Sequence, residues 1–211
     1  MITSNSMEVN DEVYLSFSGE ISANTTETLI ATLSECCNQG VRRAYLMFST
    51  PGGSVMHGMN LYNVMRALPI ELTMHNVGNV DSIGNVVFLA GVKRYACAHS
   101  TFMFHGVGFD LEGNQRLEEK LLRERLETVH AEHKRIGAII RERSKLDDAA
   151  VQELFLQQQT KDAVFAAHYG IVDAIRDVSI PAGAPILSLD SARPLSEISA
   201  NNLSAIKRVP R

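Results

Sequence analysis

The chain has 211 residues, of which 45% are hydrophobic and 21% charged, which is ordinary for a globular protein with one sizeable core. Its net charge of −4 gives no reason to expect nucleic acid as a partner. We see neither a signal-peptide pattern nor an apolar run long enough to span a membrane. Three cysteines without metal-ligand spacing indicate a reducing compartment, so we expect a cytoplasmic protein.

The first half of the chain alternates strand and helix patterns. Strands are predicted at residues 13–17 and 44–48, and the helix between them ends at Gly40. The turn Ser49-Thr50-Pro51-Gly52-Gly53-Ser54 then opens a second helix, and a third strand covers residues 71–77. This order predicts right-handed crossovers and an α/β fold with a mainly parallel sheet.

Residues 77–98 have the pattern of a strand, a polar turn and a helix, with Ser82 in the turn. Such a bend places the serine hydroxyl at a helix N-terminus, where free N–H groups such as that of Ile83 stabilise a developing negative charge. The alternative is that Ser82 only caps the helix. Gly52 and Gly53 lack a Cβ and allow a ligand to approach closely, and their turn follows a neighbouring strand at the edge where sites form.

Short strands are predicted at residues 93–96 and 101–104, and the second delivers His105 at its end. A histidine in this place is either a residue at the edge of the core, satisfied by the backbone, or a base. A serine hydroxyl is a poor nucleophile unless an imidazole takes its proton, so the second interpretation pairs His105 with Ser82.

The longest periodic segment covers residues 112–145, with leucine, isoleucine and valine on one face and charged side chains on the other. This helix is longer than the core of such a domain can cover, so we expect its excess to be buried against another subunit. His130 and His133 lie three positions apart on it, but no carboxylate or cysteine stands at a matching position. We therefore expect no metal and no cofactor.

The remaining patterns set the domain organisation. Further helices are predicted near residues 148–155 and 162–169, and a last short strand at 171–175. We expect residues 1–12 to form a flexible N-terminus and residues 13–178 one domain. The last part, residues 179–211, is predicted to be a tail that is disordered or wrapped over a neighbour.

Four motifs, taken together, have a known counterpart. They are Ser49-Thr50-Pro51-Gly52-Gly53-Ser54-Val55, Gly78-Asn79-Val80-Asp81-Ser82-Ile83-Gly84, Phe102-Met103-Phe104-His105 and Ala166-Ala167-His168-Tyr169-Gly170-Ile171-Val172-Asp173. In order and spacing they resemble the ClpP proteolytic subunits of the ClpP/crotonase superfamily, over roughly residues 13–175. The resemblance implies the ClpP/crotonase-like fold, with repeated ββα units and a long protruding oligomerisation helix, the role that the 112–145 helix matches.

The resemblance also implies a function. It is that of a serine endopeptidase that cleaves peptides and unfolded proteins by acyl-enzyme chemistry, with Ser82 as nucleophile and His105 as general base. Backbone N–H groups of Gly52, Gly53 and Ile83 would form the oxyanion hole. Family members stack heptameric rings around a chamber and receive chains from an ATPase unfoldase. A homo-oligomer and an unfoldase partner are therefore implied, with no role for nucleic acid or membrane.

The third catalytic residue departs from the family pattern. The family has an Asp in the helix after the long one, and counting back without a gap from Gly170 places that position at Leu154. A leucine cannot orient an imidazolium. The adjacent Glu153 is the acid candidate, although a shift of one position rotates a helical side chain by about 100°. Asp81 and Asp162 are other acids of unknown reach.

Two alternatives stay open. One is an inactive ClpP-like subunit with a structural role, which Leu154 favours. The other is a crotonase-type acyl-CoA enzyme that holds a thioester oxyanion on backbone N–H groups, although that chemistry needs no serine nucleophile. The chain also has His105-Gly106-Val107 where the family has His-Gln-Pro, which weakens the inference to an unfoldase partner more than the inference to the fold.

Overall fold

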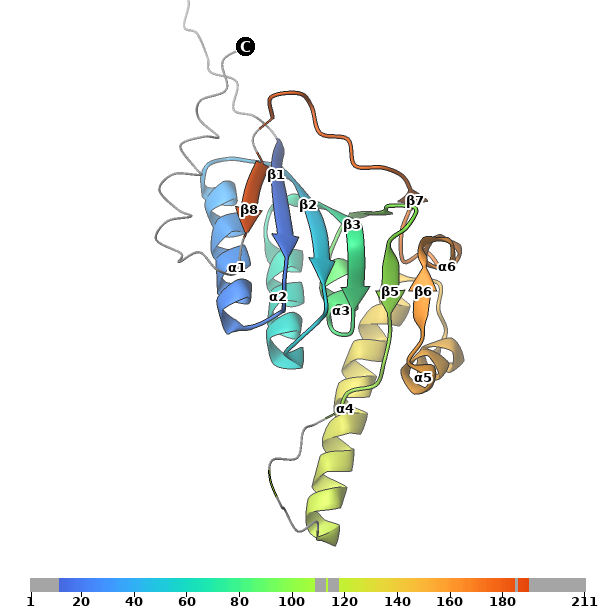
Figure 1. Ribbon diagram of the computed structural model, residues 1–211. Coiled ribbons are helices and arrows are strands. Elements are labelled where there is room, and N and C mark those ends of the chain that lie inside the picture. The colour runs from blue at the N-terminus through green and yellow to red at the C-terminus, as the bar shows by residue number, and fades with distance from the viewer. Residues whose placement is uncertain (1–11, 109–112, 114–117, 185, 190–211) are drawn as a thin grey trace, which may run out of the picture.

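The computed structural model describes residues 12–108, 113, 118–184 and 186–189 (Figure 1). Within these residues one sheet has the strand order β6-β5-β3-β2-β1-β8, and β4 extends it by pairing with β3 and β7. The strands are β1 (Glu12–Ser18), β2 (Arg43–Thr50), β3 (Glu71–Asp81), β4 (Lys93–Ala96), β5 (Thr101–Met103), β6 (Thr160–Asp162), β7 (Ala174–Ile175) and β8 (Ile186–Leu189).

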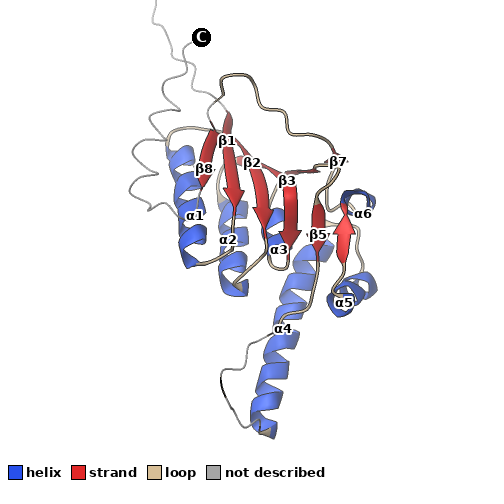
Figure 2. Ribbon diagram, in the orientation of Figure 1, coloured by secondary structure: helices blue, strands red, loops and turns tan. Residues whose placement is uncertain are grey.

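All strand pairs of this sheet are parallel except β5 with β6. The helices are α1 (Ala23–Asn38), α2 (Val55–Ala67), α3 (Gly84–Phe88), α4 (Glu119–Arg143), α5 (Asp148–Gln157) and α6 (Ala163–His168). Figure 2 shows α1, α2 and α3 next to one another against the sheet. The predicted α/β class with a mainly parallel sheet is therefore confirmed.

The core lies between the central strands and these helices. Leu15, Leu46 and Leu72 occupy β1, β2 and β3 and are fully buried, as a parallel sheet covered by helices requires. Each such side chain stabilises the fold by about 1.5–3 kcal/mol relative to an exposed position. Helices α5 and α6 begin after aspartate N-caps, where Asp147 and Asp162 accept backbone N–H bonds.

Strand β3 pairs with two short strands, β4 and β5, along one of its edges. Its first half pairs with β4 at residues 73–76, and its last residues pair with β5, with Asp81 opposite Met103. The two short strands therefore follow one another along the same edge of β3. Ser82, which comes directly after β3, and His105, two residues after β5, consequently leave the sheet at neighbouring points.

The long helix α4 runs out from the body of the molecule (Figure 1). It begins at Glu119 and ends at Arg143, inside the predicted range of 112–145, of which residues 112 and 114–117 lie outside the described residues. Its buried residues are confined to the C-terminal half, Ile136 to Ile140, whereas Leu122 and Leu126 are 48% and 54% exposed. The N-terminal half of its apolar stripe is thus not covered by the described part of this chain.

The C-terminal prediction needs a correction. Residues 186–189 form strand β8, which pairs in parallel with β1, so this part of the predicted tail belongs to the sheet. The reason is its alternation, since Leu187 and Leu189 are buried while Ile186 and Ser188 are exposed. The rest of the predicted tail from residue 190, and the predicted flexible segment 1–11, lie outside the described residues.

Candidate active site

Ser82 occupies a strained turn between β3 and α3. Its φ angle is 56°, in the left-handed region that non-glycine residues seldom adopt. Such strain costs about 1–3 kcal/mol and is concentrated at functional sites. The cap of α3 is Ile83, with no side-chain cap bond, so the structure does not support the alternative in which Ser82 serves only as a helix cap.

Glycines allow the turn after β2 to approach Ser82. A Cβ on Gly52, whose φ is 92°, would lie 2.6 Å from the Ser82 Cβ and 2.8 Å from the Asp81 carbonyl oxygen. A Cβ on Gly84 would lie 2.4 Å from Thr50 Cγ2. The two turns therefore meet at a distance that only glycine permits, whereas the sequence predicted a close approach of the Gly-Gly pair to a ligand.

The three predicted oxyanion donors differ in their hydrogen bonding. The N–H of Gly52 donates to Thr50 Oγ1 at 3.0 Å and is already engaged. Beside it, Ile21 bonds the Gly52 carbonyl and the Ser54 N–H in a parallel bridge, which turns the N–H of Gly53 away from Ile21.

The N–H groups of Gly53 and Ile83 form no hydrogen bond within the described part of the chain. Both residues line the pocket that contains Ser82. Of the predicted set, these two are free to bind a negative charge, and Gly52 serves instead to hold the turn.

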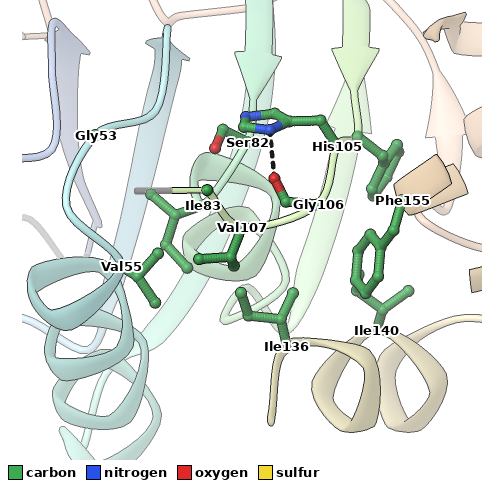
Figure 3. A pocket seen from close by; sticks show the side chains of 12 residues that line it. Gly53, Val55, Ser82, Ile83, His105, Gly106, Val107, Ile136, Ile140 and Phe155 are labelled. Carbon is green, nitrogen blue, oxygen red and sulfur yellow. Dashed lines mark hydrogen bonds between the residues drawn. The ribbon is translucent and has the colours of Figure 1, made fainter. Parts of the chain in front are cut away.

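His105 lies beside Ser82 and lines the same pocket (Figure 3). Its Nδ1 is 2.7 Å from the carbonyl oxygen of Gly106. A carbonyl only accepts, so Nδ1 carries the proton, and in the neutral ring Nε2 is left with its lone pair. Among the described residues, Ser82 Oγ makes no hydrogen bond with the imidazole of His105. The distance between a catalytic serine and its base is often long in enzymes without a bound substrate.

The two backbone N–H groups that follow His105 each donate a hydrogen bond to a neighbouring helix. The N–H of Gly106 donates to the carbonyl of Phe155 on α5 at 3.1 Å. The N–H of Val107 donates to Nε2 of His133 on α4 at 2.8 Å. Burial, helped by the nearby His130, lowers the pKa of His133, which favours the neutral ring that this bond requires.

The structure does not bring the acid candidate to His105. Glu153 is exposed on α5 and its carboxylate accepts a hydrogen bond from Gln157, one turn further along the same helix. Leu154 is 4% exposed and belongs to the hydrophobic core. This corrects the prediction for Glu153, because the adjacent position that faces inward is the apolar one, and the carboxylate on the next position faces solvent.

The other acids also have partners elsewhere. Asp81 accepts from the Asn79 side chain at 2.6 Å, and Asp162 accepts from the Phe165 N–H as the cap of α6. Among the described residues, therefore, the group bonded to His105 Nδ1 is the Gly106 carbonyl rather than a carboxylate.

The pocket is lined mainly by apolar side chains. Val55, Phe104, Ile136, Ile140 and Phe155 surround the space next to Ser82, and Figure 3 shows the labelled members converging on it from several elements. Such a lining is suited to an apolar side chain or peptide segment.

Two further features of the site were not predicted from the sequence. Asn85, on α3, is 2% exposed and its Nδ2 donates to the carbonyls of Ser82 at 3.1 Å and Met103 at 2.8 Å. Its signal in the sequence is a single amide within an apolar run. For His133 the sequence suggests only a metal ligand, although it shares the helical face of Val129 and Ile136.

Neither a metal site nor a membrane-spanning helix is found in the part of the chain that the structure describes. Among the described residues, no group of three or more histidine, cysteine or acidic side chains is arranged to hold a metal ion. In the same part of the chain, no helix combines the length and apolarity needed to cross a bilayer.

Comparison with known proteins gives a consistent set of relatives. A family model described as Clp protease matches residues 3–179. The ATP-dependent Clp protease proteolytic subunit 2 of Corynebacterium diphtheriae is 31% identical over 141 residues, 62% of this chain and 64% of that protein. The ATP-dependent Clp protease proteolytic subunit of Oltmannsiellopsis viridis is 29% identical over 133 residues, 62% of this chain and 66% of that protein.

A third relative matches over a shorter segment. The ATP-dependent Clp protease proteolytic subunit 2 of Thermobifida fusca is 35% identical over 83 residues, 36% of this chain and 41% of that protein. In these three matches the chain spans from about two fifths to two thirds of the length of its relatives.

Proposed function

This chain belongs to the Clp protease family, and we propose from that premise that it is a serine endopeptidase in which Ser82 is the nucleophile and His105 the general base. The observation that carries the proposal is the left-handed turn at Ser82, which lies beside His105 in a pocket with two unengaged N–H groups. A nucleophile, a base and oxyanion donors directed at one point are the requirements for acyl transfer.

The proposed reaction follows from these positions. Ser82 Oγ attacks the scissile carbonyl and gives its proton to His105 Nε2. The N–H groups of Gly53 and Ile83 hold the oxyanion, and His105 then protonates the leaving amine. Water then attacks the carbonyl of the acyl-enzyme, with His105 again as the base. His105 returns the proton to Ser82 Oγ as the acid product leaves. The apolar pocket takes a side chain of the peptide substrate.

Among the described residues no carboxylate bonds to His105, and this sets the expected activity. A neutral carbonyl at Nδ1 keeps the correct tautomer of His105, but it stabilises the imidazolium less than a carboxylate does. Changing the acid of a triad to its amide lowers kcat by about four orders of magnitude, chiefly through the wrong tautomer. Since the tautomer here is correct, we expect activity reduced from that of a full triad but measurable.

A second candidate function is that of an inactive subunit with a structural role. The observation that favours it is the same hydrogen bond, in which His105 faces a backbone carbonyl and no carboxylate of the described residues. The two functions differ in one property, because only the enzyme forms a covalent bond at Ser82.

The partners and the location belong to the proposal as well. The exposed leucines of α4 support assembly with further copies, for which we propose stacked rings that enclose the sites, and an ATPase unfoldase is the corresponding source of unfolded substrate. A cytoplasmic location stays a prediction. It is compatible with Cys36, Cys37 and Cys97, which are free thiols.

Labelling with a fluorophosphonate tests the proposal. We expect covalent modification of the wild-type chain at Ser82, located by peptide mass spectrometry, and loss of that label in Ser82→Ala. Ser18→Ala, which changes an exposed serine at the end of β1, is the matched control and keeps the label. A wild-type chain that folds and assembles but takes up no label, even at high probe concentration, contradicts the endopeptidase and leaves the structural subunit.

A further inference from the structure

One peptide group connects His105 to His133. The carbonyl of Gly106 and the N–H of Val107 belong to the same planar unit, and in a trans peptide they point in opposite directions. The carbonyl accepts from His105 Nδ1 at 2.7 Å, and the N–H donates to His133 Nε2 at 2.8 Å. The two imidazoles are thus the ends of a continuous chain of hydrogen bonds.

The direction of every bond in this chain is fixed. A backbone N–H only donates, so His133 Nε2 accepts and its Nδ1 carries the proton of the neutral ring. The hydrogen bond from the Val107 N–H to His133 polarises the peptide between Gly106 and Val107. The Gly106 carbonyl is therefore a stronger acceptor for His105. The positive charge that His105 acquires during catalysis is therefore supported by two acceptors in series.

The residue type at position 106 fits this arrangement. A Cβ on Gly106 would lie 2.9 Å from Nε2 and 3.1 Å from Cε1 of His133. Any larger residue would push the ring away from the Val107 N–H. The ring cannot easily retreat, because it packs against Phe155 with ring centroids 5.0 Å apart, and the Phe155 carbonyl holds the Gly106 N–H.

We propose that His133 is a positioning residue for His105. Through Val107 it holds the Gly106 carbonyl at His105 Nδ1, where that carbonyl takes the place of the orienting acid. The inference rests on the proposed function for its consequence in catalysis, but the arrangement of the two rings can be measured without any activity.

The kinetic test compares three variants by their rate of fluorophosphonate labelling. His133→Phe keeps the ring against Phe155 and removes the acceptor, and we expect the maximal labelling rate to fall about 3- to 10-fold, with the half-saturating probe concentration unchanged. His133→Gln carries Oε1 about where Nε2 stood and should restore most of the rate. His130→Phe, on an exposed position of the same helix, is the control and should label like the wild type.

Two kinetic outcomes overturn the inference while leaving the proposed function intact. One is a His133→Phe variant that labels as fast as the wild type. The other is a His133→Gln variant as slow as His133→Phe, since packing rather than the acceptor would then be responsible. The melting temperature of each variant shows whether a loss of rate reflects unfolding, and a His133→Phe chain that does not fold leaves the decision to His133→Gln and to the spectrum described next.

Nitrogen NMR of the wild-type protein labelled at histidine separates the inference from the proposed function. We expect the Nδ1–H tautomer for both His105 and His133, each assigned by substitution to Gln. If Ser82 takes no label but both tautomers are found, the endopeptidase fails and the hydrogen-bond chain stands. If His133 carries its proton on Nε2, the inference fails whatever Ser82 does.

Discussion

The backbone N–H of Ser82 donates to the carbonyl of Met103 at 2.8 Å, so the turn of the proposed nucleophile is tied to the strand that delivers the proposed base. The same carbonyl accepts from Asn85 Nδ2 at 2.8 Å, and this amide also bonds the Ser82 carbonyl. His105 follows Met103 by two residues. One acceptor thus fixes the relative position of both candidate catalytic residues before any substrate is present.

Substitution of Asn85 should therefore affect both stability and labelling. Asn85→Ala removes the donor from two buried carbonyls, and we expect the free energy of unfolding to fall by about 1–3 kcal/mol. The labelling rate at Ser82 should fall with it, because the left-handed turn loses a restraint. Urea unfolding and fluorophosphonate labelling measure the two effects.

The matched control for this prediction is Asn60→Ala, which changes an exposed asparagine on α2 and should leave both quantities unchanged. An Asn85→Ala chain with wild-type stability would show that the backbone N–H groups of Ser82 and Asn85, which also bond the Met103 and Ser82 carbonyls, satisfy them without the side chain. The idea that Asn85 fixes the turn would then have to be abandoned.

Substitution of two glycines with similar φ angles distinguishes the cost of a left-handed backbone from the cost of a steric clash. Gly52 has φ 92° and Gly40 has φ 81°, but a Cβ on Gly40 meets nothing within 4 Å, whereas one on Gly52 meets Ser82 and Asp81. Gly40→Ala should cost about 1–2 kcal/mol of stability through the left-handed backbone alone. Gly52→Ala adds the collision and should cost more than about 3 kcal/mol.

The labelling rate extends this comparison. Gly40→Ala should keep the wild-type rate at Ser82, while Gly52→Ala should lose most of it because the turn carrying Gly53 moves away. Thermal unfolding and labelling of the same two preparations provide the data. Equal losses in the two variants would mean that the close approach of the two turns has no importance.

The sequence predicted the regular elements well where hydrophobic periodicity is strong. The parallel pairing of β1, β2 and β3 followed from alternating strand and helix patterns. His105 was paired with Ser82 because a serine nucleophile needs an imidazole base, and both residues line one pocket. In contrast, β6 is three residues long and polar, and only its antiparallel contact with β5 makes it a strand. No local pattern could have identified it.

The hydrogen-bond chain to His133 shows another limit of the sequence. The helical spacing of Val129, His133 and Ile136 places the histidine on the apolar face, a signal that predicts burial but no partner. Its partner is the backbone N–H of Val107, after β5. Every residue type except proline has a backbone N–H, so the sequence does not indicate which one is the partner. The exposure of Glu153 beside the buried Leu154 likewise depends on how α5 is rotated against the core.

A buried histidine predicts how stability changes with pH. His75 on β3 is 0% exposed, with ring nitrogens bonded to the Tyr45 hydroxyl and, at 3.0 Å, to the Arg176 carbonyl. Burial lowers the pKa of His75 below its ordinary value of 6.5, so the unfolded chain binds more protons near that pH. The free energy of unfolding should therefore decrease as the pH falls below about 6.5, and this contribution should level off below the folded pKa.

Urea unfolding between about pH 5 and pH 7 measures this slope. His75→Gln removes the titrating group and should give a shallower dependence, whatever its own effect on stability. His133, whose pKa is also lowered by burial, supplies a remaining part of the slope. His99→Gln, at an exposed position, is the control and should keep the wild-type slope. An unchanged slope in His75→Gln would assign the acid sensitivity to other groups.

The uncovered half of α4 leads to a prediction about assembly. Leu122 and Leu126 are about half exposed in the single chain and Leu121 is partly buried, although all three lie on the apolar stripe of the helix. Burying two or three leucines against another copy contributes about 1.5–3 kcal/mol each. Replacing all three by Ala should therefore lower the oligomeric mass measured by light scattering, while the melting temperature of the isolated subunit changes little.

The control replaces Glu119 and Arg123, an exposed ion pair on the same helix, by Ala. This change keeps helix propensity high and removes only surface charge, so the mass should stay unchanged. If the leucine variant keeps the wild-type mass, the stripe is covered by some other part of the same chain, and assembly through α4 is refuted.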